Sequence, residues 1–329
     1  MKWGILATGN IATKFAGTLL QMEDQEAVAC ASRNLQKAEA FAENYGIKRA
    51  YGSYEELVLD KEVEAVYIAT PNNLHYENCR MCLEAGKHVL CEKPFTVNAG
   101  EARALLDLAE KRGLFIMEAF WVRFLPAVKK LQKIIASGEI GDVVWMRCEY
   151  GFAVSGARKD RKFDSALAGG ALLDIGIYNL GFVRMIMGNE QPVAVSSKAH
   201  MNEYGTDDLS TVVLTYSGGR MAVATTAMGL PMGRNAVIWG TKGCIQIEDH
   251  QHLQRFVVKP EGKEAYQVEM PFMINGFEYQ ILETAGSIAK GLVYSEAYGK
   301  KDMLESMELL DEIRKDWNLK FACEQADYK

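Results

Sequence analysis

Two short runs of the sequence carry residues that can transfer a proton. Glu92-Lys93-Pro94 follows the apolar run 87–91, and a Lys at the end of a strand presents its ammonium at the carboxyl edge of a sheet, where open α/β sheets bind ligands. Much later in the chain, Asp174 and Tyr178 are four residues apart, so a helix would place them on one face. Lys, Asp and Tyr together make a proton-transfer set.

This set suits hydride transfer between an alcohol and a nicotinamide, which requires a base for the hydroxyl proton. The reference pKa of Tyr is about 10, and a nearby Lys ammonium lowers it by about 1–3 pH units. Lys93 and Tyr178 would therefore act as a pair, with Asp174 orienting the substrate or holding Lys93 charged. The residues alone leave an alternative open, in which Tyr178 is an ordinary interface tyrosine and Asp174 a solvated helix residue.

A glycine turn near the N-terminus predicts a dinucleotide site. The first strand runs into Ala7-Thr8-Gly9-Asn10-Ile11-Ala12 and then into a helix. Aligned to G-x-G-x-x-G/A, Gly9 lets the backbone approach a pyrophosphate and the helix N-terminus offers unpaired N–H groups, so we expect Thr8, Gly9, Asn10 and Ile11 to bind cofactor. Ala7 replaces the first glycine, which is tolerable if its φ stays negative.

The end of the second strand predicts which dinucleotide binds. An NAD enzyme usually has Asp or Glu there, whereas this chain has Ser32 and Arg33, with Lys37 one helical turn later. Arg33 can fork onto a 2′-phosphate and Ser32 can donate to it, which favours NADP(H) over NAD(H). In the alternative, Arg33 is a solvated surface residue.

Further cofactor contacts are expected where later strands end. Thr70, Pro71 and Asn72 precede a helix that includes His75, and together with Glu92 and Lys93 they would lie along the cofactor. A metal site is not expected, because ligands at i and i+7 on one helix, such as His75 and Cys82, lie too far apart for one zinc ion.

Aromatic and basic residues between the two runs suggest substrate contacts. Trp121, Arg123 and Phe152 would offer an aromatic platform and a cation to a sugar ring or cyclic diol, although helical aromatics are more often core residues. The basic loop 153–168 is either a solvated loop or a lid.

The elements that must position these residues fall into two groups. We expect strands at 2–7, 26–32, 49–51, 64–69, 87–91 and 114–117. They alternate with helices expected at 10–21, 34–44, 73–85 and 97–112, and such alternation predicts a parallel sheet. After a helix at 121–136 come strands at 142–152, 192–201, 209–216, 220–228, 234–240, 243–248, 253–259 and 264–269, then helices at 275–290 and 296–316. We therefore predict an α/β Rossmann doubly wound parallel sheet (1–120, dinucleotide binding). It is followed by an α+β domain with a large, mostly antiparallel sheet (121–329, substrate binding and dimerisation).

These motifs together resemble the Gfo/Idh/MocA oxidoreductase family. The resemblance rests on Glu92-Lys93-Pro94, on the spacing of Asp174 and Tyr178, on the turn 7–12 and on 69–75, and it covers essentially the whole chain. The run 118–126 is similar to a narrower branch, that of the dimeric dihydrodiol dehydrogenases and NADP-dependent D-xylose 1-dehydrogenases. The resemblance implies Lys93, Asp174 and Tyr178 as the catalytic set, with a commonly cis Lys-Pro bond. It also implies Ser32 and Arg33 at the 2′-phosphate, and a homodimer or higher homo-oligomer formed through the C-terminal sheet.

Composition and charge limit the kinds of molecule that we expect this protein to bind. The net charge is −6 with no basic block, so nucleic acid and anionic membrane surfaces are poor partners, and a small sugar or cyclic alcohol is expected instead. We expect no apolar run as long as a membrane span, no signal peptide, and free thiols for the seven cysteines in a reducing cytoplasm. The alternative to an enzyme is a non-catalytic, dinucleotide-sensing regulatory protein of the same fold, although such regulators tend to lose the catalytic Lys or Tyr.

Overall fold

The computed structural model describes residues 1–325, apart from the side chains of residues 157 and 158. The chain divides into two compact units, Met1–Trp121 with Met273–Met307, and Val122–Phe272 with Glu308–Lys329. The segment Met273–Met307, which we expected in the second domain, thus belongs to the first unit. The functions assigned to the two domains stay a prediction.

The first unit is built on a six-stranded parallel sheet. Its order is β3-β2-β1-β4-β5-β6, and every pairing is parallel. The strands are β1 (Lys2–Leu6), β2 (Glu26–Ala31), β3 (Arg49–Tyr51), β4 (Ala65–Ile68), β5 (His88–Cys91) and β6 (Ile116–Glu118). This order confirms the predicted doubly wound sheet. Sheets of this kind bind ligands outside the carboxyl ends of the strands where the order reverses, which here is between β1 and β4.

Helices connect these strands, and capping residues mark where several of them begin and end. Asn34, Ser53 and Asn98 accept a backbone N–H at three helix N-termini, and the left-handed Gly46 and Gly113 end two of the helices. The connecting helices are α1 (Asn10–Leu19), α2 (Leu35–Tyr45), α3 (Tyr54–Val58), α4 (His75–Glu84) and α5 (Ala99–Arg112). Helix α9 (Glu278–Ala289) also belongs to the first unit, and the boundary between the units falls within α10 (Lys300–Asp316). The short helix α3 was not predicted.

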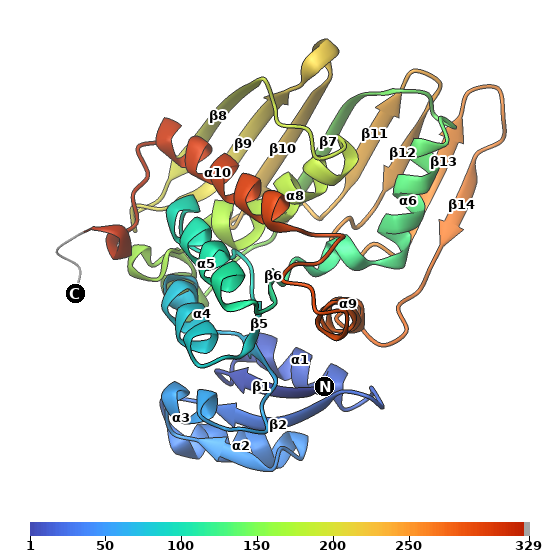
Figure 1. The fold of residues 1–329 in the computed structure, drawn as a ribbon. Helices are drawn as coiled ribbons and strands as arrows, with labels where there is room; N and C mark the ends of the chain where they lie inside the picture. The colour runs from blue at the N-terminus through green and yellow to red at the C-terminus, as the bar shows by residue number, and fades with distance from the viewer. Residues whose placement is uncertain (326–329) are drawn as a thin grey trace. The chain divides into compact units, whose positions relative to one another are not determined.

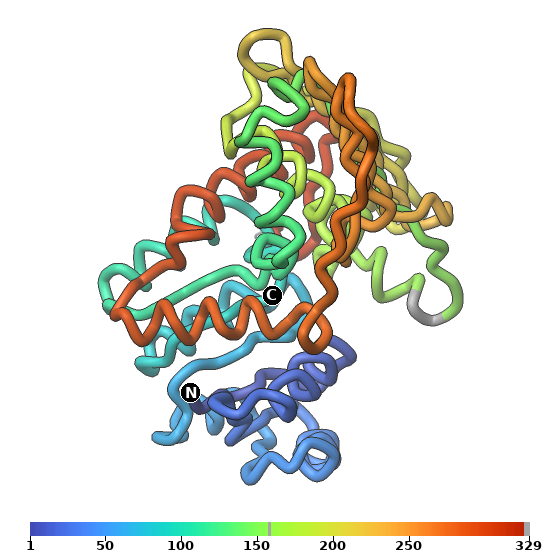
Figure 2. The backbone as a smooth tube through the Cα atoms, turned by 90° about the vertical axis from the view of Figure 1, so that its right-hand side faces the viewer, coloured from blue at the N-terminus to red at the C-terminus, as the bar shows by residue number. Residues whose placement is uncertain are grey.

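A segment distant in sequence completes the first unit. After residue 272 the chain returns to it (Figure 2), where the Tyr294 hydroxyl donates to the Leu106 carbonyl at 2.8 Å. The Ile116 N–H donates to the Val293 carbonyl at 3.0 Å. These bonds fix the returning segment against α5 and β6.

The second unit is built on an eight-stranded sheet with order β14-β13-β12-β11-β7-β10-β9-β8 (Figure 1). Its pairings are antiparallel except for β7 with β10, which confirms the expected large, mostly antiparallel sheet. The strands are β7 (Val143–Gly151), β8 (Ala194–Met201), β9 (Asp207–Thr215), β10 (Met221–Ala227), β11 (Ala236–Gly240), β12 (Gly243–Ile247), β13 (Arg255–Pro260) and β14 (Tyr266–Glu269).

The helices of this unit differ from expectation in three places. The predicted helix at 121–136 is a 3₁₀ turn (Trp121–Phe124) followed by α6 (Pro126–Ala136), because Pro126 suits the first position of a helix. The expected loop 153–168 contains α7 (Ala157–Phe163). The expected helix of Asp174 and Tyr178 is a π-helical turn (Leu172–Gly176) continued by α8 (Ile177–Ile186).

Helix α8 packs against β7 and β10. The buried Asn179 anchors it, donating to the Thr225 carbonyl and to the Thr226 hydroxyl, both at 2.9 Å. The stretch Ser165–Ile186 is apolar and long enough to span a membrane, contrary to our expectation, but 78% of its most apolar window is buried. It is therefore placed as a core helix of this unit.

Candidate active site

The glycine turn lies at the carboxyl end of β1, as predicted. Thr8 and Ile11 are half-buried, while Gly9 and Asn10 are exposed. Gly9 has a φ of −83°, and a Cβ added to it would meet no atom within 4 Å. Neither backbone conformation nor packing thus requires glycine at this position, which fits the close approach of a pyrophosphate to the start of α1.

Ala7 departs from expectation. Its φ is +76°, in the left-handed region, whereas we expected a negative value. A non-glycine residue in this region is strained, so Ala7 costs the turn some stability.

The polar residues after β2 are accessible. Arg33 and Lys37 are exposed, and Ser32 is half-buried and accepts the Asn34 N–H at 3.4 Å. Arg33 also hydrogen-bonds Tyr54. Burial raises the pKa of the Tyr54 phenol, and the positive charge of Arg33 offsets part of this rise. Two cations and a hydroxyl at one strand end fit a 2′-phosphate.

The segment after β4 is braced by His75. The imidazole is fully buried between two carbonyls, with Nδ1 2.7 Å from Pro94 O and Nε2 3.0 Å from Thr70 O. Burial lowers the pKa of His75 to about 4, so the ring is neutral at pH 7. The neutral ring has one N–H and donates to one of these two carbonyls, so His75 packs between Thr70 and the loop after Lys93. Pro71 and Asn72 are half-buried.

Lys93 lies in a cis Lys93–Pro94 pair and is half-buried. The preceding Glu92 is buried and accepts from the Tyr67 hydroxyl, and burial raises the pKa of its carboxyl even though Lys93 and Lys14 favour the charged form. The Glu92 carboxylate also accepts the Lys93 N–H at 3.3 Å. The buried carboxylate of Glu92 thus holds the backbone N–H of Lys93.

Glu118, a residue that we did not predict, supports the same loop. It is 1% exposed, accepts the Phe95 N–H at 2.8 Å and also accepts from the Tyr298 hydroxyl. Burial raises the pKa of Glu118 to about 7. A sequence signal existed, because Glu118 ends the apolar run of β6 just as Glu92 follows β5.

Trp121 is 3% exposed, and its ring is 5.4 Å from that of Phe277. The Lys14 ammonium lies 4.6 Å from the Trp121 centroid and 4.1 Å from the Phe277 centroid. Burial lowers the pKa of Lys14, although Glu92 and Glu278 favour its charged form. A ring covered in this way is packed like a core residue, so its substrate contact stays a prediction.

In the second unit, Asp174 and Tyr178 occupy successive turns where a π-helix gives way to an α-helix. Such π segments are frequent at functional sites. The Tyr178 ring is 6.2 Å from Tyr150, which is 6.0 Å from Phe152. The structure therefore groups Tyr178 with one predicted substrate residue, Phe152, through Tyr150.

Asp174 forms an ion pair with Lys162 of α7. The Lys162 ammonium also lies 5.4 Å from the centroid of Phe152. Lys162 was noticed only as part of a basic loop, because nothing in the sequence shows where such a loop lies against the following helix.

A buried carboxyl group accepts a hydrogen bond from the first residue of the π-helical turn. Asp207, at the start of β9, is fully buried and accepts the Leu172 N–H at 2.8 Å. Burial raises the pKa of Asp207 to about 7. Gly170 is required beside it, since its φ is +114° and an added Cβ would lie 2.5 Å from Asp207 Oδ1. We found no sequence signal for this role.

Arg123 lies apart from this group. Its guanidinium donates to the Asn189 amide oxygen at 3.4 Å, beyond the C-terminal end of α8, whereas Tyr178 is in the first turn of that helix. Its substrate contact stays a prediction.

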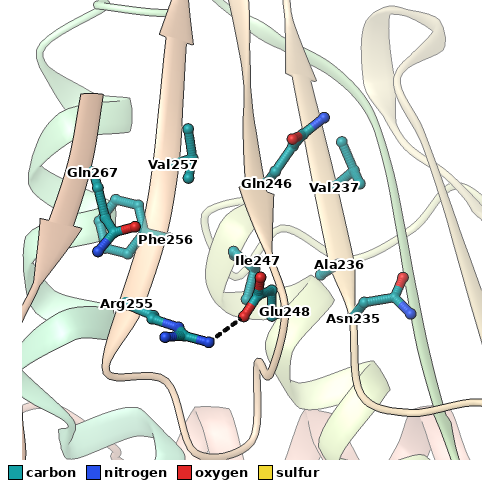
Figure 3. Close-up of a pocket in the computed structure, with 10 residues that line it drawn as sticks. All are labelled: Asn235, Ala236, Val237, Gln246, Ile247, Glu248, Arg255, Phe256, Val257 and Gln267. Atoms are coloured by element: carbon teal, nitrogen blue, oxygen red, sulfur yellow. Dashed lines mark hydrogen bonds and ion pairs between the residues drawn. The ribbon is translucent and has the colours of Figure 1, made fainter. Parts of the chain in front are cut away.

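A hollow on the second sheet lies elsewhere (Figure 3). It is formed by β11 to β14, with an ion pair between Arg255 and Glu248 at 2.6 Å, and no predicted site residue lines it. Among residues 1–325, no group of three or more His, Cys, Asp or Glu side chains is placed to hold a metal ion. No disulfide joins any of the cysteines in this part of the chain.

Comparison with known proteins agrees with this architecture. Residues 1–120 match the family model described as "Oxidoreductase family, NAD-binding Rossmann fold", and residues 128–246 match "GFO/IDH/MocA C-terminal domain". The chain is 38% identical over 331 residues to trans-1,2-dihydrobenzene-1,2-diol dehydrogenase of Bos taurus, covering 98% of both chains. It is 42% identical to that of Mus musculus over 266 residues, covering 80% of this chain and 79% of the relative.

Solved structures give the same result. An aldose-aldose oxidoreductase from Caulobacter crescentus, complexed with glycerol, superposes with a TM-score of 0.87 at 26% identity, covering 96% of both chains. A 3-ketoreductase from Actinomadura kijaniata, in complex with NADP and TDP-benzene, superposes with a TM-score of 0.86 at 25% identity, covering 96% of this chain and 97% of the other.

Proposed function

This chain belongs to the Gfo/Idh/MocA oxidoreductase family, and on that premise we propose that it uses NADP(H) and that Lys93, Asp174 and Tyr178 carry its chemistry. It is an NAD(P)-dependent dehydrogenase acting on a CH–OH group of a cyclic diol or sugar. The observation that carries this conclusion is the similarity over nearly the whole chain to relatives named for the oxidation of one cyclic trans-diol. The alternative of a dinucleotide sensor is disfavoured because Lys93, Asp174 and Tyr178 are all present.

The preference for NADP(H) is supported by the residues at the end of β2. A 2′-phosphate would accept hydrogen bonds from the exposed Arg33 and from Ser32, with the Lys37 ammonium adding charge. No carboxylate is present there to bind a 2′-hydroxyl. The open space above Gly9 and the start of α1 would accept the pyrophosphate.

The proton chemistry is assigned to Tyr178. When bound, the nicotinamide supplies the hydride acceptor. Tyr178 takes the hydroxyl proton through its phenol oxygen, and the Lys93 ammonium favours the tyrosinate by its charge. Asp174 accepts a hydrogen bond from the substrate and fixes the orientation of the carbon that reacts.

Two residues act through Lys93 without touching substrate. His75 packs between the Pro94 and Thr70 carbonyls, and Glu118 holds the Phe95 N–H. We propose both as positioning residues, and the cofactor contact expected for His75 stays a prediction.

Two variants test the catalytic assignment. Tyr178→Phe and Lys93→Met should each lower kcat by about 100-fold or more, since acid–base catalysis contributes about 10²–10⁴-fold. The dissociation constant of NADPH, measured by fluorescence, should change little. Full turnover in either variant would remove that residue from the set.

The remaining proposals concern assembly and location. The half-buried open face of the second sheet, which includes the Trp145–Trp239 pair with rings 4.6 Å apart, is proposed to form a homodimer. We also propose a cytoplasmic location, in line with the absence of disulfides among residues 1–325.

A further inference from the structure

We propose that Lys162 determines substrate specificity, and that its ammonium and the Asp174 carboxylate together bind the hydroxyl adjacent to the one that is oxidised. The inference rests on the proposed function, since it assumes that Tyr178 acts on an alcohol carbon. It names the substrate class as vicinal diols, including those within sugar rings.

The contacts of Lys162 place it among the predicted site residues of the second unit. Its ammonium pairs with Asp174 and lies 5.4 Å from the centroid of Phe152. The side chain of Lys162 is 31% exposed and that of Asp174 is 25% exposed, so both can be reached from solvent. Cation, carboxylate and aromatic face thus meet at one accessible point.

The backbone of Lys162 is held in place, so its side chain starts from a fixed position. Its carbonyl accepts the Gly170 N–H at 2.9 Å, just before the π-helical turn that carries Asp174. A Cβ at Gly169 would lie 2.4 Å from the same carbonyl oxygen, so glycine is required for this close approach. The geometry therefore couples the position of Lys162 to that of Asp174.

The chemistry of the pair suits a hydroxyl. A carboxylate only accepts hydrogen bonds and an ammonium only donates them, whereas a hydroxyl does both. One hydroxyl can therefore donate to Asp174 and accept from Lys162 without breaking the ion pair. The ring carbons of a cyclic substrate would lie against Phe152, and a mono-alcohol has no group for this position.

A purely structural role for Lys162 is the competing explanation. Partly exposed ion pairs contribute little to stability, so stability alone is a weak reason for this pair. Lys159 on the same helix provides a matched control: it pairs with Glu203 at 2.9 Å and lies 5.7 Å from the Tyr204 centroid, and neither partner is a predicted site residue.

The test compares two substrates in the wild-type protein and three variants. We would measure kcat and KM with NADP for trans-1,2-cyclohexanediol and for cyclohexanol in Lys162→Met, Lys162→Arg and Lys159→Met. Loss of a charge-assisted hydrogen bond should lower kcat/KM of Lys162→Met for the diol by about 10- to 100-fold, mainly through KM. The cyclohexanol value should stay within about twofold, Lys162→Arg should recover part of the diol activity, and Lys159→Met should match the wild type.

Each other outcome has a separate meaning. Equal losses for diol and mono-alcohol in Lys162→Met would show that Lys162 acts on the chemistry through Asp174, and no loss for either would show that it binds no substrate; both results overturn the proposal. A wild-type protein that binds NADPH but oxidises neither compound nor any sugar would instead overturn the proposed function, and this inference with it.

Discussion

Lys93 is surrounded by buried groups that respond to its charge. Glu92 and Glu118 are each fully buried, each accepts from a tyrosine hydroxyl, and the Lys93 ammonium opposes the burial that raises the pKa of both carboxyls. The buried His75 completes the support of this loop. The charge of Lys93 thus acts on two buried carboxyls of the first unit.

The preference for NADP(H) depends on Arg33. Arg33→Ala should weaken NADPH binding by about 10- to 100-fold, the value of a charge-assisted hydrogen bond, because a 2′-phosphate would lose its bidentate partner. NADH has no 2′-phosphate, so its dissociation constant should change less than about threefold. Titration of both cofactors by fluorescence quenching checks this, with Lys48→Ala, a cation paired with Glu26 at 2.9 Å, as control. Equal weakening of NADPH and NADH would refute the contact.

Glu118 should make stability depend on pH. Its pKa is raised to about 7 in the folded protein from 4.5, so the folded state holds the proton more tightly than the unfolded state. The resulting stabilisation is complete below about pH 4.5 and is lost as the pH rises through about 7, with a slope of at most about 1.4 kcal/mol per pH unit. Asp207 acts in the same direction.

The variant Glu118→Gln removes this titration and keeps an oxygen for the Phe95 N–H. Urea unfolding at pH 5 and pH 7.5 should show a smaller loss of unfolding free energy in Glu118→Gln than in the wild type. Identical losses in the two proteins would mean that Glu118 does not titrate in this range.

Local rules of sequence lead to a prediction for some single residues of the candidate site and not for others. Lys93 and Glu92 stand out because charges follow an apolar run, and Arg33 because it replaces an expected carboxylate. The contacts of Lys162 with Asp174 and of Asp207 with Leu172 join residues 12 and 35 positions apart, so they depend on tertiary packing that no local pattern encodes.

The π-helical turn Leu172–Gly176 and helix α8 form the element that presents Asp174 and Tyr178. Asp207 accepts the N–H of Leu172, the first residue of this turn, and α8 packs on β7 and β10. Contacts with the second sheet thus set the positions of Asp174 and Tyr178.

Removal of the Asp207 carboxyl should disturb this element. Asp207→Ala leaves the buried Leu172 N–H without its acceptor, so we expect a loss of about 1–3 kcal/mol in unfolding free energy and a lower kcat, with little change in NADPH affinity. Asp207→Asn keeps an acceptor oxygen and should be milder in both measurements. An unchanged kcat in a folded Asp207→Ala protein would contradict this role.

Helices and strands were predictable wherever periodicity was strong. The six strands of the first sheet lie within a few residues of their predicted places, because buried parallel strands are short apolar runs between turn signals. The helix α7 was missed because its seven residues are too few to show a period, and the π-helical turn because its extra residue leaves no signature in an apolar helix.

The division of the chain into units was less predictable than its elements. The sequence places a change of rhythm near residue 120, and the first unit does end its first segment at Trp121. The return of Met273–Met307 was not foreseen, since it rests on contacts such as that of Tyr294 with Leu106, which are 188 residues apart.

Assembly of the whole protein can be tested on the open sheet face. Val237 on β11 lies opposite Arg147 of β7 and is half-buried in the single chain. If this face forms a homodimer, Val237→Lys should give a monomer in sedimentation analysis, because it buries a second cation beside Arg147, and burying a charge without a counter-charge is costly. Leu282→Lys, a matched change at a 46% exposed position of α9, should stay dimeric. A wild-type protein that is monomeric at all concentrations would contradict the proposed dimer.

The most direct test of the account is the formation of NADPH, with NADH in parallel, by the wild-type protein across aldopyranoses, cyclitols and cyclic trans-diols. We expect turnover of at least one cyclic diol or sugar with NADP, and a lower kcat/KM with NAD by about 10-fold or more. Turnover favouring NAD would contradict the cofactor assignment. Tight binding of NADPH without turnover of any compound in either direction would contradict the assignment of Tyr178, Lys93 and Asp174 as a catalytic set.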